Sequence, residues 1–210
     1  TREEMYFHPS KWGPWQEQLA TFVQHLTWTF ARRVKAEKQD DCRTPAEWRI
    51  TPRIQEEFVR ILRTICLLSL FSKDPVTSLS TQSSLKRMAF LQPELILPAI
   101  LQRSYNSLEA LETTQRTGVV IAVLATTSQP MLSRSLYAAG AKHLAPLLHL
   151  CLPGIDMNDS MKTMSTCMFI LSASISLVIS DASMNMDDYD DETLIRVDDE
   201  SVSTLSAEDY

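Results

Sequence analysis

Glycine is scarce in this chain, with four residues among 210. Glycine supplies the left-handed backbone conformations that hairpin turns and phosphate-binding loops need. Its scarcity argues against a sheet protein and against a nucleotide-binding α/β enzyme. The aspartate and glutamate side chains that could serve as catalytic acids or bases are accompanied by no Gly-rich loop, metal-ligand motif or activated nucleophile. The sequence therefore predicts stacked helices and no enzyme, with no catalytic residues, no cofactor and no metal site.

The cysteines also lack a pattern. Cys42, Cys66, Cys151 and Cys167 are scattered without the C-x-x-C spacing of metal or redox sites. The chain begins with Thr1, and no charged-then-apolar leader follows. We therefore expect reduced, mostly buried thiols in an intracellular protein, and a chain that is a segment of a longer one.

The formal net charge of −6 is divided unevenly along the chain. Residues 181–210 hold eleven acidic residues and one arginine, while the remainder is mildly basic. Runs of like charge repel one another and bury little surface. We predict a helical body over residues 1–182 and a disordered acidic linker or insertion over residues 183–210. The alternative to a solvated linker is a surface insertion that mimics or repels charged substrates, or one that is modified at Ser201, Ser203 or Thr204.

Apolar residues three or four positions apart predict helices throughout residues 1–182. The expected helices cover about residues 15–38, 52–71, 77–90, 93–111, 115–127, 132–151 and 158–180. Thr51 and Pro52 look like an N-cap and a first helical residue. Pro98 predicts a kink, and Asn158 or Asp156 is the expected cap of the last helix. The centres of alternate helices lie about 40 residues apart, the period of HEAT-type helix pairs. This pattern alone leaves a solenoid and a compact bundle open.

The last predicted helix includes an uncharged stretch from Met164 to Ser180. Serine and threonine recur through it, and Lys162 and Asp181 bracket it closely, so we expect no membrane span. Its apolar stripe instead predicts a buried solenoid helix: Met161, Met164, Met168, Leu171, Ile175 and Val178.

Few polar residues suggest a site. The histidines (His8, His25, His143 and His149) form no four-ligand metal pattern and are interpreted as core or groove-lining residues. Carboxylate pairs such as Glu56-Glu57 and Glu109 with Glu112 are interpreted as solvated charge. Arg32, Arg33, Lys35 and Lys38 cluster at a predicted helix C-terminus, where cations interact favourably with the helix dipole. A phosphate or nucleic-acid footprint is the alternative for this cluster, but few aromatic residues are interleaved with it, so no direct nucleic-acid partner is predicted.

Five segments at predicted turns and helix starts follow one another along the chain in a characteristic order. They are Phe71-Ser72-Lys73-Asp74-Pro75, Leu91-Gln92-Pro93-Glu94-Leu95-Ile96-Leu97-Pro98, Arg103-Ser104-Tyr105-Asn106-Ser107-Leu108-Glu109, Lys142-His143-Leu144 and Leu152 through Thr163. In this order they resemble the middle region of the giant single-chain HEAT-repeat proteasome activators, the proteasome activator subunit 4 family. The resemblance covers about residues 11–183.

The resemblance implies an all-α, HEAT-like solenoid that caps the proteasome core particle. It implies ATP- and ubiquitin-independent degradation of peptides and of unfolded or acetylated proteins, histones included, in the nucleus and cytoplasm, with links to DNA repair. The family docks through a C-terminal hydrophobic-Tyr-any motif, which is absent from the terminal Glu208-Asp209-Tyr210. The family's acetyl-lysine module and inositol-phosphate-binding residues match no position here. The alternative is another HEAT or armadillo scaffold, such as a nuclear transport receptor.

One loop within this set invites a stability prediction. Pro153 and Gly154 fix the turn before the last helix. If Gly154 has a positive φ, Gly154→Val is expected to destabilise the segment by about 1–3 kcal/mol.

Overall fold

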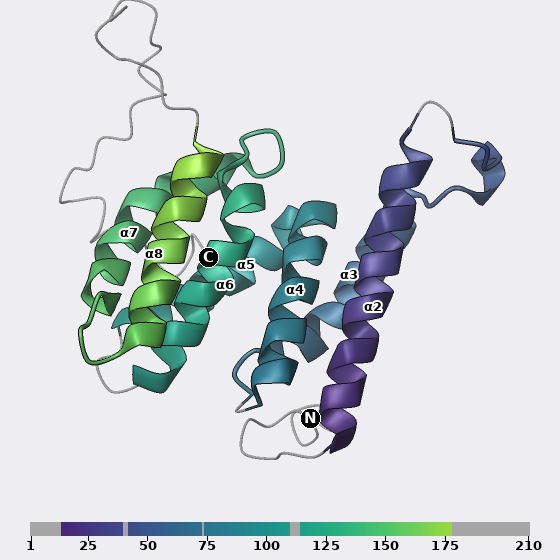
Figure 1. Cartoon of the computed structure of the whole chain (residues 1–210). Helices are drawn as coiled ribbons and strands as arrows, with labels where there is room; N and C mark the ends of the chain where they lie inside the picture. Colours follow the sequence, from purple (N-terminus) through teal and green to yellow (C-terminus); the bar gives the residue numbers. More distant parts are fainter. Residues whose placement is uncertain (1–13, 40–41, 73, 110–113, 178–210) are drawn as a thin grey trace, which may run out of the picture. The chain divides into compact units, whose positions relative to one another are not determined.

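The computed structural model describes residues 14–39, 42–72, 74–109 and 114–177. Within these residues it contains α-helices and short 3-10 helices, and no strand (Figure 1). The helices are α2 (Pro14–Glu37), α3 (Pro52–Ser69), α4 (Pro75–Leu91), α5 (Pro93–Glu109), α6 (Thr114–Leu132), α7 (Leu144–Cys151) and α8 (Ser160–Ser176), with 3-10 helices η1 (Ala46–Trp48), η2 (Ala138–His143) and η3 (Leu152–Gly154). The predicted all-α, HEAT-like fold is confirmed, while the acidic stretch 183–210 lies outside the described residues.

The chain forms two compact units, residues 1–100 and 101–210. In the first unit α2 and α4 pack side by side, and α3 packs against α4 (Figure 1). Ala20 of α2 lies near Thr81 of α4, and Lys35 of α2 lies near Arg87 of α4. The two helices therefore run in the same direction, with the intervening α3 reversed. Alternation of this kind is how helical repeats stack.

Proline and its preceding residue set the helix starts in the first unit. The Thr51 hydroxyl accepts from the Ile54 N–H ahead of Pro52, as predicted. Asp74 does the same for α4, because its carboxylate accepts from the Thr77 N–H at 2.7 Å, with Pro75 following. This helix therefore starts at Pro75 rather than at the expected Thr77.

The prediction of one continuous helix over residues 132–151 is wrong. Helix α6 extends to Leu132, and η2 and α7 follow as separate elements. The break is explained by Gly140, where an added Cβ would lie 1.8 Å from the Met131 carbonyl oxygen. The chain doubles back onto the end of α6 so closely that only a glycine fits.

In the second unit α6 and α8 pack along much of their length (Figure 1). Thr166, Phe169 and Ala173 form the buried side of α8. Where the structure describes it, the stripe expected to be buried is instead exposed, with Met164 62% and Ile175 76% accessible; Val178 lies outside the described residues. We define the α8 outer face as Met161, Met164, Met168, Leu171 and Ile175.

Helices α2 and α3 also carry apolar side chains that the described residues leave exposed. Phe22 and Leu26 are exposed on α2, and Ile54 and Ile61 are exposed on α3. The neighbouring Phe30 and Phe58 rings stack at 3.8 Å between centroids and join the two helices. Both the first and the last described helices therefore have an apolar face in addition to the one they bury.

Candidate functional site

A groove runs between the C-terminal parts of α2 and α4, both in the first unit. Its volume is about 530 Å³. Four cations and two exposed aromatic rings border it, and no acidic residue is among those that line it. We call it the basic groove, formed by Trp28, Ala31, Arg32, Val34, Lys35, Lys38, Arg87, Phe90 and Leu91.

Two of the four cations are oriented by neighbouring groups. The Arg32 guanidinium lies over the Trp28 ring, 5.3 Å from its centroid, a cation–π contact. The Arg87 Nη1 donates to the Ser83 carbonyl oxygen at 2.8 Å and to the Ser83 hydroxyl. Burial lowers the pKa of Arg87, because a partly desolvated guanidinium loses hydration that favours its charged form.

In the part of the chain that the structure describes, the cations of the basic groove have no acidic partner: Arg32, Lys35, Lys38 and Arg87 form no ion pair there with a carboxylate. Lys35 and Lys38 are exposed at the end of α2, where the helix dipole interacts favourably with them. The groove thus gathers positive charge on an apolar floor.

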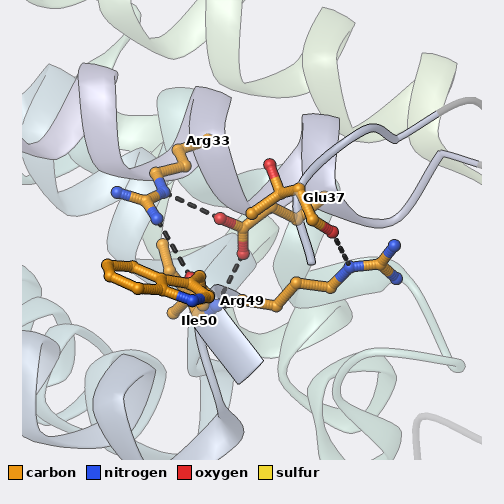
Figure 2. Close-up of polar contacts among 6 residues, drawn as sticks. Arg33, Glu37, Arg49 and Ile50 are labelled. Carbon is orange, nitrogen blue, oxygen red and sulfur yellow. Dashed lines mark hydrogen bonds and ion pairs between the residues drawn. The ribbon is translucent and has the colours of Figure 1, made fainter. Parts of the chain in front are cut away.

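A separate polar cluster closes the turn from α2 to α3 (Figure 2). Glu37 accepts from the Arg33 Nε at 2.7 Å and from the Ile50 N–H at 2.6 Å. Arg33 also donates to the Trp48 carbonyl oxygen at 3.1 Å. The Ile50 N–H and then Arg33 hold the pKa of Glu37 below its usual range. This Glu37 cluster ties the loop to the end of α2.

The predicted basic cluster therefore divides into two parts. Arg33 belongs to the Glu37 cluster and has a structural role, whereas Arg32, Lys35 and Lys38 border the basic groove. The sequence did not indicate that Arg87, Trp28 and Phe90 lie beside these cations. The spacing of residues along α2 does not predict which helix packs against it, and the groove forms only because α2 and α4 pack together.

The histidines and paired carboxylates form no reactive cluster in the described residues. His25 and His149 are exposed, and His8 lies outside the described residues. Glu56 pairs with Arg60 on the surface of α3, Glu109 is exposed, and Glu112 lies outside the described residues. Across the described ranges, no three His, Cys, Asp or Glu side chains gather to hold a metal ion.

Two of the predicted turn segments meet inside the second unit. The Tyr105 hydroxyl lies 3.2 Å from the His143 Nδ1, and both side chains are buried. Tyr105 comes from the Arg103–Glu109 segment and His143 from the Lys142–Leu144 segment. These segments therefore have a packing role, because a buried polar pair must satisfy its own hydrogen bonds.

The Leu152–Thr163 segment forms the turn into α8. Asp159, rather than Asn158 or Asp156, is the N-cap, and its carboxylate accepts from the Lys162 N–H at 3.0 Å. The Thr163 hydroxyl accepts from the Asp156 N–H at 2.9 Å and donates to the Asp156 carbonyl at 2.7 Å. Asp156 thus orders the loop while Asp159 caps the helix.

The positive φ suggested for Gly154 is not found. No described residue, glycine or otherwise, has a positive φ. An added Cβ at Gly154 would instead lie 2.3 Å from the Thr166 Oγ1 and 3.1 Å from the Ile121 Cδ1. The glycine is required by its close approach to α8 and α6, not by backbone conformation.

The cysteines are only partly buried. Cys66 and Cys151 are buried, Cys42 is half-buried, and Cys167 is exposed. Burial raises the pKa of Cys66 and of Cys151 to about 12.

Among the described helices, none combines the length and hydropathy that a membrane crossing needs.

Comparison with known proteins identifies the same region that the turn segments indicated. The family model described as "Proteasome activator complex subunit 4, mid HEAT repeats region" matches residues 2–208. The human proteasome activator complex subunit 4 is 32% identical over 193 residues, which cover 90% of this chain and 10% of the human protein. The zebrafish subunit 4B is 28% identical over 90% of this chain and 10% of that protein.

The similarity extends to plants. The Arabidopsis proteasome activator subunit 4 is 26% identical over 86% of this chain and 11% of that protein. The chain thus spans about a tenth of the length of these curated relatives. Since the family model covers nearly all of the sequence, the chain belongs to the mid HEAT-repeat region of the proteasome activator complex subunit 4 family.

Proposed function

We propose that this chain is a wall segment of a proteasome activator and acts through shape rather than through chemistry of its own. The observation that carries this proposal is the two-sided apolar character of α8. One side packs on α6, and the α8 outer face is exposed. A surface helix of a globular protein normally has one apolar stripe, so a second one indicates a further packing partner.

The exposed side chains on α2 and α3 extend the same reasoning to the other end of the described chain. Phe22, Leu26 and Ile61 are exposed on helices whose other faces are buried. In a solenoid each repeat covers its neighbours, and uncovered ends are costly. We infer that flanking repeats of a longer polypeptide cover both faces.

For the full-length protein we propose association with the proteasome core particle and activation of peptide hydrolysis without ATP or ubiquitin. Unfolded or acetylated proteins, histones included, are the proposed substrates, and nucleus and cytoplasm the proposed locations. The family match favours this function over that of a nuclear transport receptor. The segment's share is to keep the wall continuous.

The test uses the full-length protein and purified core particle, with hydrolysis of a fluorogenic peptide as the readout. Wild-type protein is expected to accelerate hydrolysis and to co-migrate with the core particle. Leu171→Glu, on the α8 outer face, is expected to reduce both effects because it places a charge where a flanking helix packs. Ser174→Glu is the matched control, since Ser174 is exposed on the same helix outside that face.

The results separate the two parts of the proposal. Failure of the wild-type protein to bind or stimulate the core particle would contradict the activator function. Equal stability and activity of Leu171→Glu and Ser174→Glu would contradict the packing role of the α8 outer face.

A further inference from the structure

We propose that the basic groove binds an acidic peptide segment that carries an aromatic side chain. The groove lies within the first unit and involves neither the α8 outer face nor any catalytic chemistry. The inference does not depend on the proposed function.

Charge is the first argument. Arg32, Lys35, Lys38 and Arg87 converge on one groove, and none has a carboxylate partner among the described residues. The nearby acidic residue of α2, Glu37, is engaged by Arg33 and the Ile50 N–H instead. The groove therefore keeps a positive potential that an anionic ligand would neutralise.

The pre-positioning of Arg87 strengthens this argument. Its side chain is half-buried, and its guanidinium donates to the Ser83 backbone carbonyl and hydroxyl. Partial burial of a cation without a carboxylate partner costs free energy that a bound carboxylate would offset. Arg87 also donates in a planar geometry suited to carboxylates.

The apolar surface distinguishes a peptide from a small anion. Trp28 and Phe90 are 45% and 37% exposed at the groove, and Ala31, Val34 and Leu91 line it between them. An inorganic phosphate gains nothing from this surface, whereas an aromatic side chain flanked by carboxylates contacts both the rings and the cations. The volume of about 530 Å³ is large enough to take a side chain, since it falls within the range of small-molecule pockets.

The chain's own sequence provides a probe of this chemistry. Residues 187–192 read Asp-Asp-Tyr-Asp-Asp-Glu. A fluorescein-labelled peptide with the sequence of residues 185–193 is titrated with the full chain in about 0.15 M salt, where distant charges are screened. The same chain with Asp187, Asp188, Asp190 and Asp191 changed to Asn removes competition from its own copy of the sequence.

Four protein variants test the groove by fluorescence anisotropy. Lys35→Glu/Lys38→Glu is expected to weaken peptide binding at least about tenfold. Phe90→Ala is expected to weaken it about fivefold, because the aromatic contact is lost while the charge is unchanged. Lys86→Glu is the matched control, since Lys86 is exposed on α4 outside the groove, and is expected to change affinity less than about twofold. Arg32→Gln repeats the charge test should the double variant lose its helical circular dichroism.

The ligand is varied in parallel. A peptide with Tyr189→Ala is expected to bind about fivefold more weakly than the parent peptide. Inorganic tripolyphosphate is expected to compete poorly. Absence of saturable binding, an equal effect of Lys86→Glu and the groove variants, or tripolyphosphate binding that matches the peptide and ignores Phe90→Ala would each overturn the proposal.

Discussion

Replacing Gly140 by alanine tests the most demanding packing contact in the second unit. The new Cβ would lie 1.8 Å from the Met131 carbonyl oxygen, 2.8 Å from the Met131 carbonyl carbon and 2.9 Å from the Tyr137 Cδ1. Carbon and oxygen atoms in contact normally lie more than about 3 Å apart. Residue 140 and the end of α6 must therefore separate by more than about 1 Å, and two of the three clashing atoms belong to backbone.

The expected cost follows from this geometry. Forcing extra atoms into a packed site typically costs about 1–3 kcal/mol, and a clash with backbone belongs at the upper end because no side chain can rotate away. We expect Gly140→Ala to lower the free energy of unfolding by about 2–3 kcal/mol. Gly140 has no positive φ, so the effect comes from the contact alone.

Gly118 provides the matched control, because an added Cβ there meets no atom within 4 Å. It lies inside α6, where alanine favours helix formation over glycine. Gly118→Ala is therefore expected to raise stability by about 0.5–1 kcal/mol. The same substitution is then expected to change the free energy of unfolding in opposite directions at two glycines of one unit.

The assay is urea unfolding followed by far-UV circular dichroism. Circular dichroism is needed because all four tryptophans lie between residues 12 and 48, so their emission reports the first unit. A Gly140→Ala stability within about 0.5 kcal/mol of wild type would refute the close approach of η2 to α6. An equal change of stability in Gly140→Ala and Gly118→Ala would refute the steric reasoning as a whole.

Three further predictions concern single side chains. Glu37 has a lowered pKa, so the stabilisation that its carboxylate provides is present above the pKa of the unfolded state and is lost as the pH falls through the folded-state pKa. Glu37→Gln should therefore lower the free energy of unfolding at about pH 7 and lower it less at about pH 3. Cys167 is exposed, whereas burial raises the pKa of Cys66 and Cys151 to about 12, so mass spectrometry at about pH 8 should find Cys167 alkylated before either of them; early modification of Cys66 would contradict its burial. Tyr105→Phe removes the 3.2 Å contact with His143 and should cost about 1–2 kcal/mol by thermal unfolding, and an unchanged melting temperature would show that the pair contributes nothing.

Helix starts could be predicted from the sequence where the cap is local. Thr51 followed by Pro52 specifies the start of α3, and the hydroxyl contact to the Ile54 N–H is present. Asp74 followed by Pro75 carries the same signal for α4, although the expected helix began two residues later. Both signals reside in adjacent residues, so no tertiary information is needed to find them.

The break between α6 and α7 could not be predicted in this way. Residues 132–151 keep a helical apolar spacing, yet Leu136 is exposed while Leu144 and Leu147 are buried. The contact that decides the break joins Gly140 to Met131, and it depends on how the chain folds back. The basic groove could not be predicted from the sequence either, because Lys35 and Arg87 lie close together only through the packing of α2 on α4.

Helix α8 shows why hydrophobicity alone misassigned the buried side. The sequence stripe of methionine, leucine and isoleucine is real, but it forms the α8 outer face. The side against α6 uses Thr166 and Ala173 beside Phe169, and Gly154 approaches Thr166 too closely to allow a Cβ. Small residues let helices approach closely, so they can mark a contact as well as large ones do. A helix with one closely packed side and one long-chain apolar side has room for a partner on each, which is what an internal position in a helical wall requires.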